Sequence, residues 1–503
     1  MLKGFTRKFK PLEILTEDQI EEIHTRTLEV LWVTGIRIEH ERALKLFERE
    51  GCQVDYDEMT VHFPASLVEE CLQKAPGKWH TRARDRKNDL IVGRDTVYFG
   101  VAPGMQTIDL DTWKPRVATM KENYDAVRVL DALPNLHFFS PYTPYFGFGA
   151  VPPVMGMLES VAARIRNSTK FQYSGYSHDC EIFTIEIGRA AGMEILGTCA
   201  LSPPLTMYRD AAESTFRFVE AGFPVRVISG AVMGGTAPAT VAGSTITNNA
   251  EVIAGVLLTQ LIRPRTRVLA KDLVFPQNMR SGAPVFGAIE IALHNVVFNQ
   301  IWRRYDIPRS NTTCYPSSKR IDFQSGYEKS QIALIAALSG VNSMLLHGSV
   351  HGELTHHPLQ AVLDDDVAGR VGRFITGVEV NDETLAVSLI EEVGAIPGHY
   401  LNKEHTRKWW KKEFFLPQAA DVLTYPEWMK SGKKHCLDYA KERMEKILAT
   451  HKVSIPLTPG QEDDIGRILN EARKYYRKKG MISDEEWEVY KKKVLESPDY
   501  PYG

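Results

Sequence analysis

Eight short apolar runs alternate with longer helical segments between residues 97 and 376, and this alternation constrains the fold more than any other feature. Short apolar runs of this kind are typical of buried parallel strands. We predict strands at Val97–Val101, Leu136–Ser140, Lys170–Gly175, Ile195–Leu201, Val225–Gly230, Thr266–Asp272, Asp306–Thr313 and Asn342–Gly348. Helices are predicted near residues 119–132, 154–167, 181–193, 206–222, 241–263, 286–304, 325–340 and 359–376.

Strands that alternate with helices of this length predict right-handed βαβ crossovers, which place parallel strands side by side. Eight such units predict an α/β fold, a closed (β/α)8 barrel of the TIM type, over residues 96–380. An open doubly wound sheet uses the same units and is the alternative.

The segments on either side of the barrel have a different pattern. Residues 1–95 predict an accessory α+β region, which begins with a capping box at Thr16-Glu17-Asp18-Gln19. Residues 381–503 predict a helical C-terminal extension in which Trp409–Phe415 is a candidate docking element. The apolar side chains of this extension favour a homo-oligomer.

The composition is that of a globular protein with no unusual charge. The 503 residues carry a formal net charge of −2, so nucleic acid is not a predicted partner. No apolar run reaches the roughly 18 residues of a membrane span, and the basic start Met1–Lys10 is not followed by the apolar region of a signal peptide. The six cysteines lack CxxC spacing, so we expect free thiols in a cytoplasmic protein with no membrane partner.

Aromatic and polar side chains gather where the predicted strands end, which is where barrels place their chemistry. These positions include Tyr98, Phe99, Tyr142, Tyr145, Tyr176, Ser229, Lys271, Asp272, Asn311 and His347. Any one of the rings could simply fill the core. Together, at one barrel mouth, they indicate an aromatic pocket that suits a quaternary ammonium group.

His347, His351, His356 and His357, with Glu353, form the densest group of metal-ligand residue types. Because the histidines extend from a strand end into a glycine-containing loop, the spacing of a helical zinc motif does not apply, and we predict no metal site. A metal-dependent barrel hydrolase or lyase stays as an alternative. The run Asp364–Asp366 is interpreted as solvated carboxylates that complement a helix dipole.

Four stretches, in order along the chain, resemble the trimethylamine methyltransferase (MttB-like) superfamily. They are Gly234–Gly243, Asn249–Gly255, Ser281–Gly287 and the segment from Ser318 to Glu328 that includes Lys319, Asp322, Gln324, Gly326 and Tyr327. The resemblance implies a barrel that moves a methyl group from an amine to the cobalt of a corrinoid (cobalamin) carried by a separate protein, as in methanogenesis and methylotrophy. It implies no tightly bound cofactor in this chain.

The founding branch of the superfamily carries pyrrolysine, which this chain lacks, so the chain is more similar to the branch of the glycine betaine methyltransferases. A quaternary amine leaves as a neutral tertiary amine, so positioning and a dry pocket matter more than proton transfer. On this reading Tyr98, Phe99, Tyr142, Tyr145 and Phe286 help to enclose the ammonium. A substrate carboxylate is assigned to Lys271 or Arg280, unless Lys271 pairs with Asp272.

Three residues are predicted to form hydrogen bonds in catalysis: Ser229, Asn311 and His347. The methyl donor is predicted to be a small quaternary amine such as glycine betaine, with carnitine, proline betaine or a methoxy compound as alternatives. A betaine-binding protein without turnover is the alternative from another class.

Overall fold

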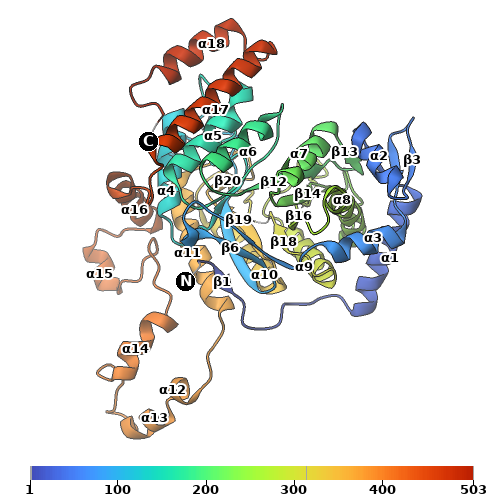
Figure 1. The fold of residues 1–503 in the computed structure, drawn as a ribbon. Coiled ribbons are helices and arrows are strands. Elements are labelled where there is room, and N and C mark those ends of the chain that lie inside the picture. The colour runs from blue at the N-terminus through green and yellow to red at the C-terminus, as the bar shows by residue number, and fades with distance from the viewer. Residues whose placement is uncertain (1–2, 313, 502–503) are drawn as a thin grey trace.

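The chain folds into a closed barrel of parallel strands surrounded by helices (Figure 1). This computed structural model describes residues 3–312 and 314–501, so the predicted strand end Thr313 and the start Met1-Leu2 lie outside the described residues. The barrel strands are, in spatial order, β7 (Thr96–Val101), β10 (Phe138–Phe139), β11 (Phe171–Tyr173), β12 (Ile195–Leu201), β14 (Val225–Ser229), β16 (Val268–Asp272), β18 (Arg309–Asn311) and β19 (Ser343–His347). Because β19 pairs in parallel with β7, the sheet closes on itself. The predicted barrel is confirmed, and the open sheet is wrong.

Each barrel strand is followed by a helix at the predicted place. These helices are α4 (Met120–Ala132), α5 (Pro153–Asn167), α6 (Cys180–Ala190), α7 (Arg209–Glu220), α8 (Val241–Ile262), α9 (Ile289–Arg304), α10 (Phe323–Ser339) and α11 (Pro358–Ile375). Thr119 forms a capping box with Glu122 at the start of α4, and Gly340 ends α10 in the left-handed conformation that a helix C-terminus favours.

The N-terminal segment packs on the outside of the barrel. The helices α1 (Glu17–Val33), α2 (Glu41–Arg49) and α3 (Ala65–Lys74) contact α8, and the predicted capping box at Thr16 is present. The segment also contains β1 (Phe5–Thr6), which pairs with β7, and the strands β2 (Ile36–Ile38), β3 (Gln53–Asp55) and β4 (Thr60–His62). These three strands form a small sheet with β13 (Thr206–Met207), which comes from the connection between β12 and α7. The predicted boundaries at residues 95 and 380 stay predictions.

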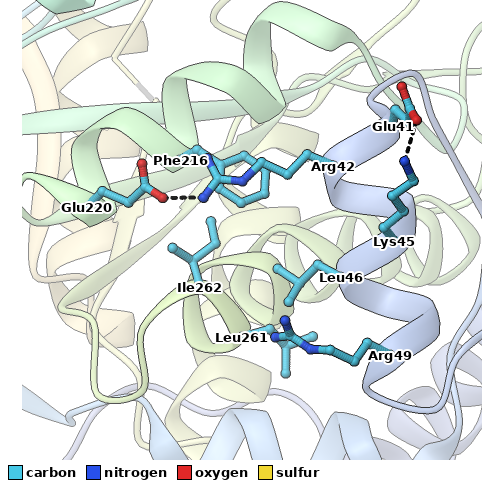
Figure 2. A pocket seen from close by; sticks show the side chains of 9 residues that line it. All are labelled: Glu41, Arg42, Lys45, Leu46, Arg49, Phe216, Glu220, Leu261 and Ile262. Carbon is cyan, nitrogen blue, oxygen red and sulfur yellow. Dashed lines mark hydrogen bonds and ion pairs between the residues drawn. The ribbon is translucent and has the colours of Figure 1, made fainter.

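A surface hollow of about 690 Å³ lies where α2 meets α7 and α8 (Figure 2). Its charged side chains already have partners: Arg42 pairs with Glu220 and lies 4.0 Å from the Phe216 ring centroid. Lys45 pairs with Glu41 one helical turn away. The Arg42 contacts attach α2 to α7 of the barrel wall, and the hollow does not share lining residues with the cavity at the barrel mouth.

The hairpin of β5 (Lys78–Thr81) and β6 (Leu90–Gly93) closes the N-terminal end of the barrel. Trp79 donates its indole N–H to the carbonyl of Val268, at 3.0 Å, where β16 begins. The Tyr98 hydroxyl, from inside the barrel, bonds to the backbone of Ile91. Access to the interior is therefore from the C-terminal ends of the strands.

Short strands build the rim of that open end. They are β8 (Thr107–Ile108), β9 (Pro115–Arg116), β15 (Val232–Met233), β17 (Phe275–Pro276), β20 (Ser349–His351) and β21 (Thr355–His356). They pair as β8 with β9, β15 with β17 and β20 with β21.

The C-terminal extension is helical, as predicted. Two of its helices pack on the barrel: α16 (Cys436–Thr450) on α4 and α11, and α17 (Pro459–Lys478) on α5 and α6. The others are α12 (Asp382–Leu385), α13 (Val387–Val393), α14 (Glu404–Glu413), α15 (Tyr425–Lys430), α18 (Asp484–Tyr490) and the short turn Lys491–Leu495. Within the described residues, no helix combines the length and apolarity that crossing a bilayer requires.

The carboxylates Asp364–Asp366 are buried, so interpreting them as solvated was wrong. Asp364 accepts hydrogen bonds from Lys329 Nζ at 2.6 Å and from the Gly348 N–H at 2.8 Å. Asp365 accepts from the Asn135 N–H, and Asp366 accepts from the backbone at residues 418 and 419. The run therefore attaches α11 to neighbouring elements.

Candidate functional site

A cavity of about 290 Å³ opens at the C-terminal ends of the barrel strands. Its wall combines strand side chains from inside the barrel with loop residues from the rim. The lining residues are Pro103, Ser140, Pro141, Tyr142, Tyr176, Thr198, Ala200, Arg226, Ile228, Lys271, Leu273, Thr312, Tyr315, Leu345 and Glu353.

The alternation of side chains along each strand decides which residues reach this cavity. On β14, Arg226 and Ile228 point inward, and on β16 the inward residue near the mouth is Lys271. Lys271 is paired in register with Ile228 on one side and with Ser310 on the other. Neighbouring strands therefore bring two cationic side chains, Arg226 and Lys271, to the same end of the barrel.

The two cations differ in their hydrogen bonds. Arg226 donates its Nε–H to Thr198 Oγ1 at 2.9 Å, which fixes the guanidinium against the cavity wall. Lys271 is 1% exposed, and its Nζ has no hydrogen-bond partner among the described residues. Burial, reinforced by the nearby Arg226 charge, holds the pKa of Lys271 well below its usual value. Burying an amine without a hydrogen-bond partner costs free energy, so Lys271 Nζ is suited to bind an anionic ligand.

Other polar atoms face the same space. Thr312 Oγ1 is buried without a partner among the described residues, and Thr312 follows β18 directly. Glu353 lies in the rim hairpin between β20 and β21 and is exposed to solvent at the mouth. The cavity thus has two basic side chains on its strand wall and a carboxylate on its rim.

Three tyrosines form the aromatic part of the wall: Tyr142, Tyr176 and Tyr315. The Tyr142 hydroxyl donates to the carbonyl of Tyr176 at 3.1 Å. A Cβ on Gly175 would lie 2.4 Å from the Tyr142 hydroxyl oxygen, so only glycine allows this ring to lie against the backbone. Phe286 contacts Tyr315 from behind, with ring centroids 6.0 Å apart, and is not part of the lining.

Among the residues selected from the sequence, Tyr142, Tyr176 and Lys271 line the cavity, and several other rings do not. Tyr98 lies at the closed end of the barrel against the hairpin. Phe99 points outward and contacts Phe5. Tyr145 is buried behind the rim, where its hydroxyl donates to Thr107.

The nominated strand-end residues Ser229, Asp272 and Asn311 point away from the cavity, toward the surrounding helices. Ser229 donates its hydroxyl to Glu251 on α8. Asp272 accepts from Asn295 at 2.6 Å and lies 3.0 Å from His294 Nδ1, so it pairs with α9 and not with Lys271. Asn311 accepts a hydrogen bond from Asn299, also on α9. The structure does not bring these three side chains to the mouth.

His347 and Arg280 lie elsewhere too. His347 is fully buried after an irregularity in β19, and its Nε2 is 3.6 Å from Asp365 on α11. Arg280 is exposed on the loop after β17.

The histidine cluster predicted from the sequence is dispersed. His356 hydrogen-bonds to the Ala102 carbonyl, His357 accepts from the Leu359 N–H at the start of α11, and His351 contacts the Phe286 ring. Burial lowers the pKa of His356 to about 3, so this side chain is neutral. In the part of the chain that the structure describes, His, Cys, Asp and Glu form no group of three or more that could hold a metal ion.

Arg226, Thr312 and Tyr315 line the cavity but were not predicted from the sequence. A signal for Arg226 was present, because this charged residue interrupts the apolar run Val225–Ile228 at a position that faces inward. Tyr315 comes from a loop after β18, and nothing in its local pattern distinguishes it from a core ring.

Glu251 on α8, the partner of the outward-facing Ser229, makes the stability of the fold depend on pH. Burial raises the pKa of this carboxyl from 4.5 to about 7, although it accepts hydrogen bonds from Ser229 and the Leu205 N–H. Because the folded state holds the proton more tightly, Glu251 costs stability as the pH rises from 4.5 to 7, by roughly 3 kcal/mol in all.

Glu251→Gln is expected to remove this loss, so the free energy of unfolding of the variant in urea should exceed that of the parent at pH 8. Near pH 4.5 the two proteins should be nearly equal. An equal difference at both values would contradict the raised pKa.

Comparison with known proteins places the chain among methyltransferases. The sequence model described as trimethylamine methyltransferase (MTTB) matches residues 1–471. The glycine betaine methyltransferase of Desulfitobacterium hafniense (strain Y51) is 30% identical over 455 residues, which cover 87% of this chain and 92% of that protein. The trimethylamine methyltransferase MttB of Methanosarcina barkeri (strain Fusaro / DSM 804) is 27% identical over 491 residues, which cover 93% and 96%. The crystal structure of the Methanosarcina barkeri monomethylamine methyltransferase covers 86% of this chain and 95% of its own, with a TM-score of 0.45 and 16% identity.

Proposed function

Because the chain belongs to the trimethylamine methyltransferase family, we propose that it demethylates a quaternary amine that carries a carboxylate, a compound of the glycine betaine class. The acceptor is a corrinoid carried by a second protein. The observation that carries the substrate class is the unpartnered amine of Lys271, buried beside Arg226 in a cavity with an aromatic wall. The resemblance seen in the loop motifs is confirmed by the family match.

The two cations suit the carboxylate of the substrate. Arg226 is anchored through Thr198, so its terminal N–H groups have a fixed direction. A carboxylate would give Lys271 Nζ the partner it lacks and would favour its protonated form, since an opposite charge raises the pKa of an amine. Thr312 supplies a hydroxyl at the same site.

The tyrosines and Glu353 suit the trimethylammonium group. A cation within about 6 Å of an aromatic ring centroid is attracted by the electron-rich face. Glu353 at the entrance adds an opposite charge nearer to solvent. The charges of the cavity are therefore arranged as the complement of a zwitterion, with the methyl groups directed toward the mouth.

The residues of this chain bind and orient the substrate and exclude water. When the C–N bond breaks, its electron pair stays on nitrogen and gives a neutral tertiary amine, so the leaving group needs no proton. The corrinoid supplies a nucleophilic cobalt as methyl acceptor. A corrin ring is too large for a cavity of about 290 Å³, so it meets the substrate at the mouth.

Exposed apolar side chains beside the mouth offer a docking surface for the corrinoid protein. Met105, Phe146 and Leu354 are 43% to 46% exposed. They are neighbours, since the Met105 N–H donates to the Glu353 carbonyl and the Phe146 N–H donates to the Gly104 carbonyl. Apolar groups grouped beside a site in this way are typical of protein contacts.

Leu354→Asp is expected to lower the rate of methyl transfer to the corrinoid protein about tenfold, because a charge would be placed in a desolvated contact. Transfer to free cobalamin should be unchanged. Val489→Asp on α18, at an apolar site of similar exposure, is the control and should change neither rate. An equal loss with both acceptors would place Leu354 in the substrate pocket and not in the protein contact.

The function is tested by incubating the protein with Co(I) cobalamin and a panel of methyl donors while recording the visible spectrum of the corrinoid. The panel contains glycine betaine, proline betaine, carnitine, choline, trimethylamine and a methoxy compound. We expect methylated corrinoid with a carboxylated quaternary amine and much less with choline. Binding without methylated product would favour the betaine-binding alternative, and no response to any quaternary amine would contradict the proposal.

A further inference from the structure

The segment from residue 378 to residue 413, called the arm below, exposes an unusual number of large apolar side chains. Its exposed apolar residues are Val378, Val380, Leu385, Val387, Ile390, Ile396, Tyr400 and Leu401. Ile396 is 96% exposed and Leu401 is 87% exposed. In the arm the large apolar side chain that is buried is Trp409.

The arm has regular structure without a core of its own. It contains α12, α13 and α14, and Figure 1 shows these helices standing clear of the barrel. Helices of this length are not stable by themselves in water, because tertiary packing supplies most helical stability. The apolar side chains of the arm therefore need a surface that this copy of the chain does not provide.

An apolar groove of about 750 Å³ lies elsewhere on the same molecule, between α10, α11 and the segment that leads into α16. Phe323, at the start of α10, is 86% exposed at this groove, and Tyr327 is 41% exposed one turn later. Cys436 and Leu437 line the opposite side. The molecule thus carries both an uncovered apolar arm and an uncovered apolar groove.

The position of the arm argues against the corrinoid protein as its partner. The arm leaves α11 just after Ile375, whose carbonyl accepts from the Lys8 N–H, beside the residues that precede β7. Its other end is attached there as well, because Arg373 donates to the Glu413 carbonyl at 2.7 Å. This is the closed end of the barrel, opposite the mouth at which the methyl group must leave.

The arm carries charges of both signs. Its first half is acidic, with Glu379, Asp382, Glu383, Glu391 and Glu392, and its last helix is basic, with Arg407, Lys408, Lys411 and Lys412. Within one chain Lys408 pairs with Glu383 and Lys403 with Glu392. The arm therefore does not present a surface of one sign, and its apolar side chains decide what covers it.

We propose that the arm docks into the α10–α11 groove of a second copy of this chain, and that the exchange is reciprocal. A reciprocal exchange closes as a dimer, since each copy gives one arm and fills one groove. The proposal does not depend on the methyl donor or on catalysis. In this arrangement, the predicted docking element Trp409–Phe415 lies partly in the arm and partly against the barrel of its own chain. Trp409 belongs to the arm, and Phe415 packs against Gly369 of its own α11.

Cross-linking tests the contact directly, because Cys436 is an exposed thiol in the groove and the other five cysteines are buried. Leu401→Cys places a second thiol on the arm. With a short bismaleimide we expect a covalent dimer on a denaturing gel, and its loss when Cys436→Ser is added. A dimer that persists without Cys436 would show arm-to-arm contact and would overturn the groove assignment.

Sedimentation velocity at micromolar concentration tests the assembly. The parent should sediment as a dimer, and the double variant Ile396→Asp/Leu401→Asp should sediment with half that mass. Both sites are almost fully exposed, so the variant should keep the circular dichroism spectrum of the parent. Val33→Asp, at a 67% exposed site on α1, is the control and should remain a dimer. A monomeric parent, or a dimer unaffected by the double variant, would overturn the proposal.

Discussion

Replacing Lys271 by methionine is expected to lower kcat/KM for glycine betaine or a related carboxylated amine roughly 100-fold or more. Removing one partner of a buried charge pair costs about 2–5 kcal/mol of binding, and each 1.4 kcal/mol is a factor of ten. Methionine has nearly the length of the lysine stem, so the cavity keeps its shape. Steady-state methyl transfer to cobalamin, measured across substrate concentrations, gives the ratio.

The matched comparison is a quaternary amine without a carboxylate, such as choline. Its kcat/KM is low with the parent and should change little in Lys271→Met, because the amine has no anion to bind. The unfolding free energy should not fall, since the parent amine is buried without a hydrogen bond to any residue that the structure describes. A loss of equal size for both substrates would indicate that Lys271 shapes the cavity and does not bind the carboxylate.

Lys329→Met is expected to destabilise the fold by about 3 kcal/mol or more, the second large effect. Lys329 Nζ is 2.6 Å from Asp364 Oδ2, and both side chains are 1% exposed. Without the lysine, Asp364 keeps its bonds to Gly348 and Gln360 but holds an uncompensated buried charge, which typically costs 3–5 kcal/mol. Urea unfolding measured at neutral pH gives the difference.

Two control variants test whether the loss in Lys329→Met comes from the unpaired buried charge. The double variant Lys329→Met/Asp364→Leu removes both charges and should recover much of the lost stability. Lys121→Met removes a surface partner of Asp125 and should cost at most about 0.5 kcal/mol. If Lys329→Met were no more harmful than Lys121→Met, the buried pair would not hold α10 to α11.

The barrel could be predicted from the sequence because its strands are buried on both sides. Runs such as Ile195–Leu201 are almost entirely apolar, and their spacing leaves room for one helix each. The order of the strands then follows from the handedness of the crossovers. The pairing of β19 with β7, which closes the barrel, is a long-range contact. It is expected from the presence of eight strand–helix units, but no local sequence pattern specifies it.

The site was harder to predict, because the last residue of a strand is not the one that faces the cavity. Ser229, Asp272 and Asn311 end their strands but point outward to α8 and α9. Their neighbours one or three residues away, Arg226 and Lys271, point inward. A shift of one residue exchanges the two faces of a strand, and an apolar run does not reveal which face is inside.

The roles of buried charges depended on partners that are distant in sequence. Asp364 looks like a solvated carboxylate until Lys329, 35 positions earlier, is found beside it. Tyr315 belongs to the site because a loop after β18 brings it there. Such contacts follow from the packing of helices and loops on the barrel, which the local pattern does not encode.

The hairpin that closes the barrel floor has a kinetic consequence. With Trp79 and Tyr98 filling that end, the cavity opens at the C-terminal ends of the strands, where the proposed function also places the corrinoid protein. On that proposal the amine loads before the corrinoid protein docks, and the demethylated product leaves after it departs. We therefore expect compulsory-order kinetics, in which an excess of the second protein slows the reaction by occupying the entrance of the empty enzyme.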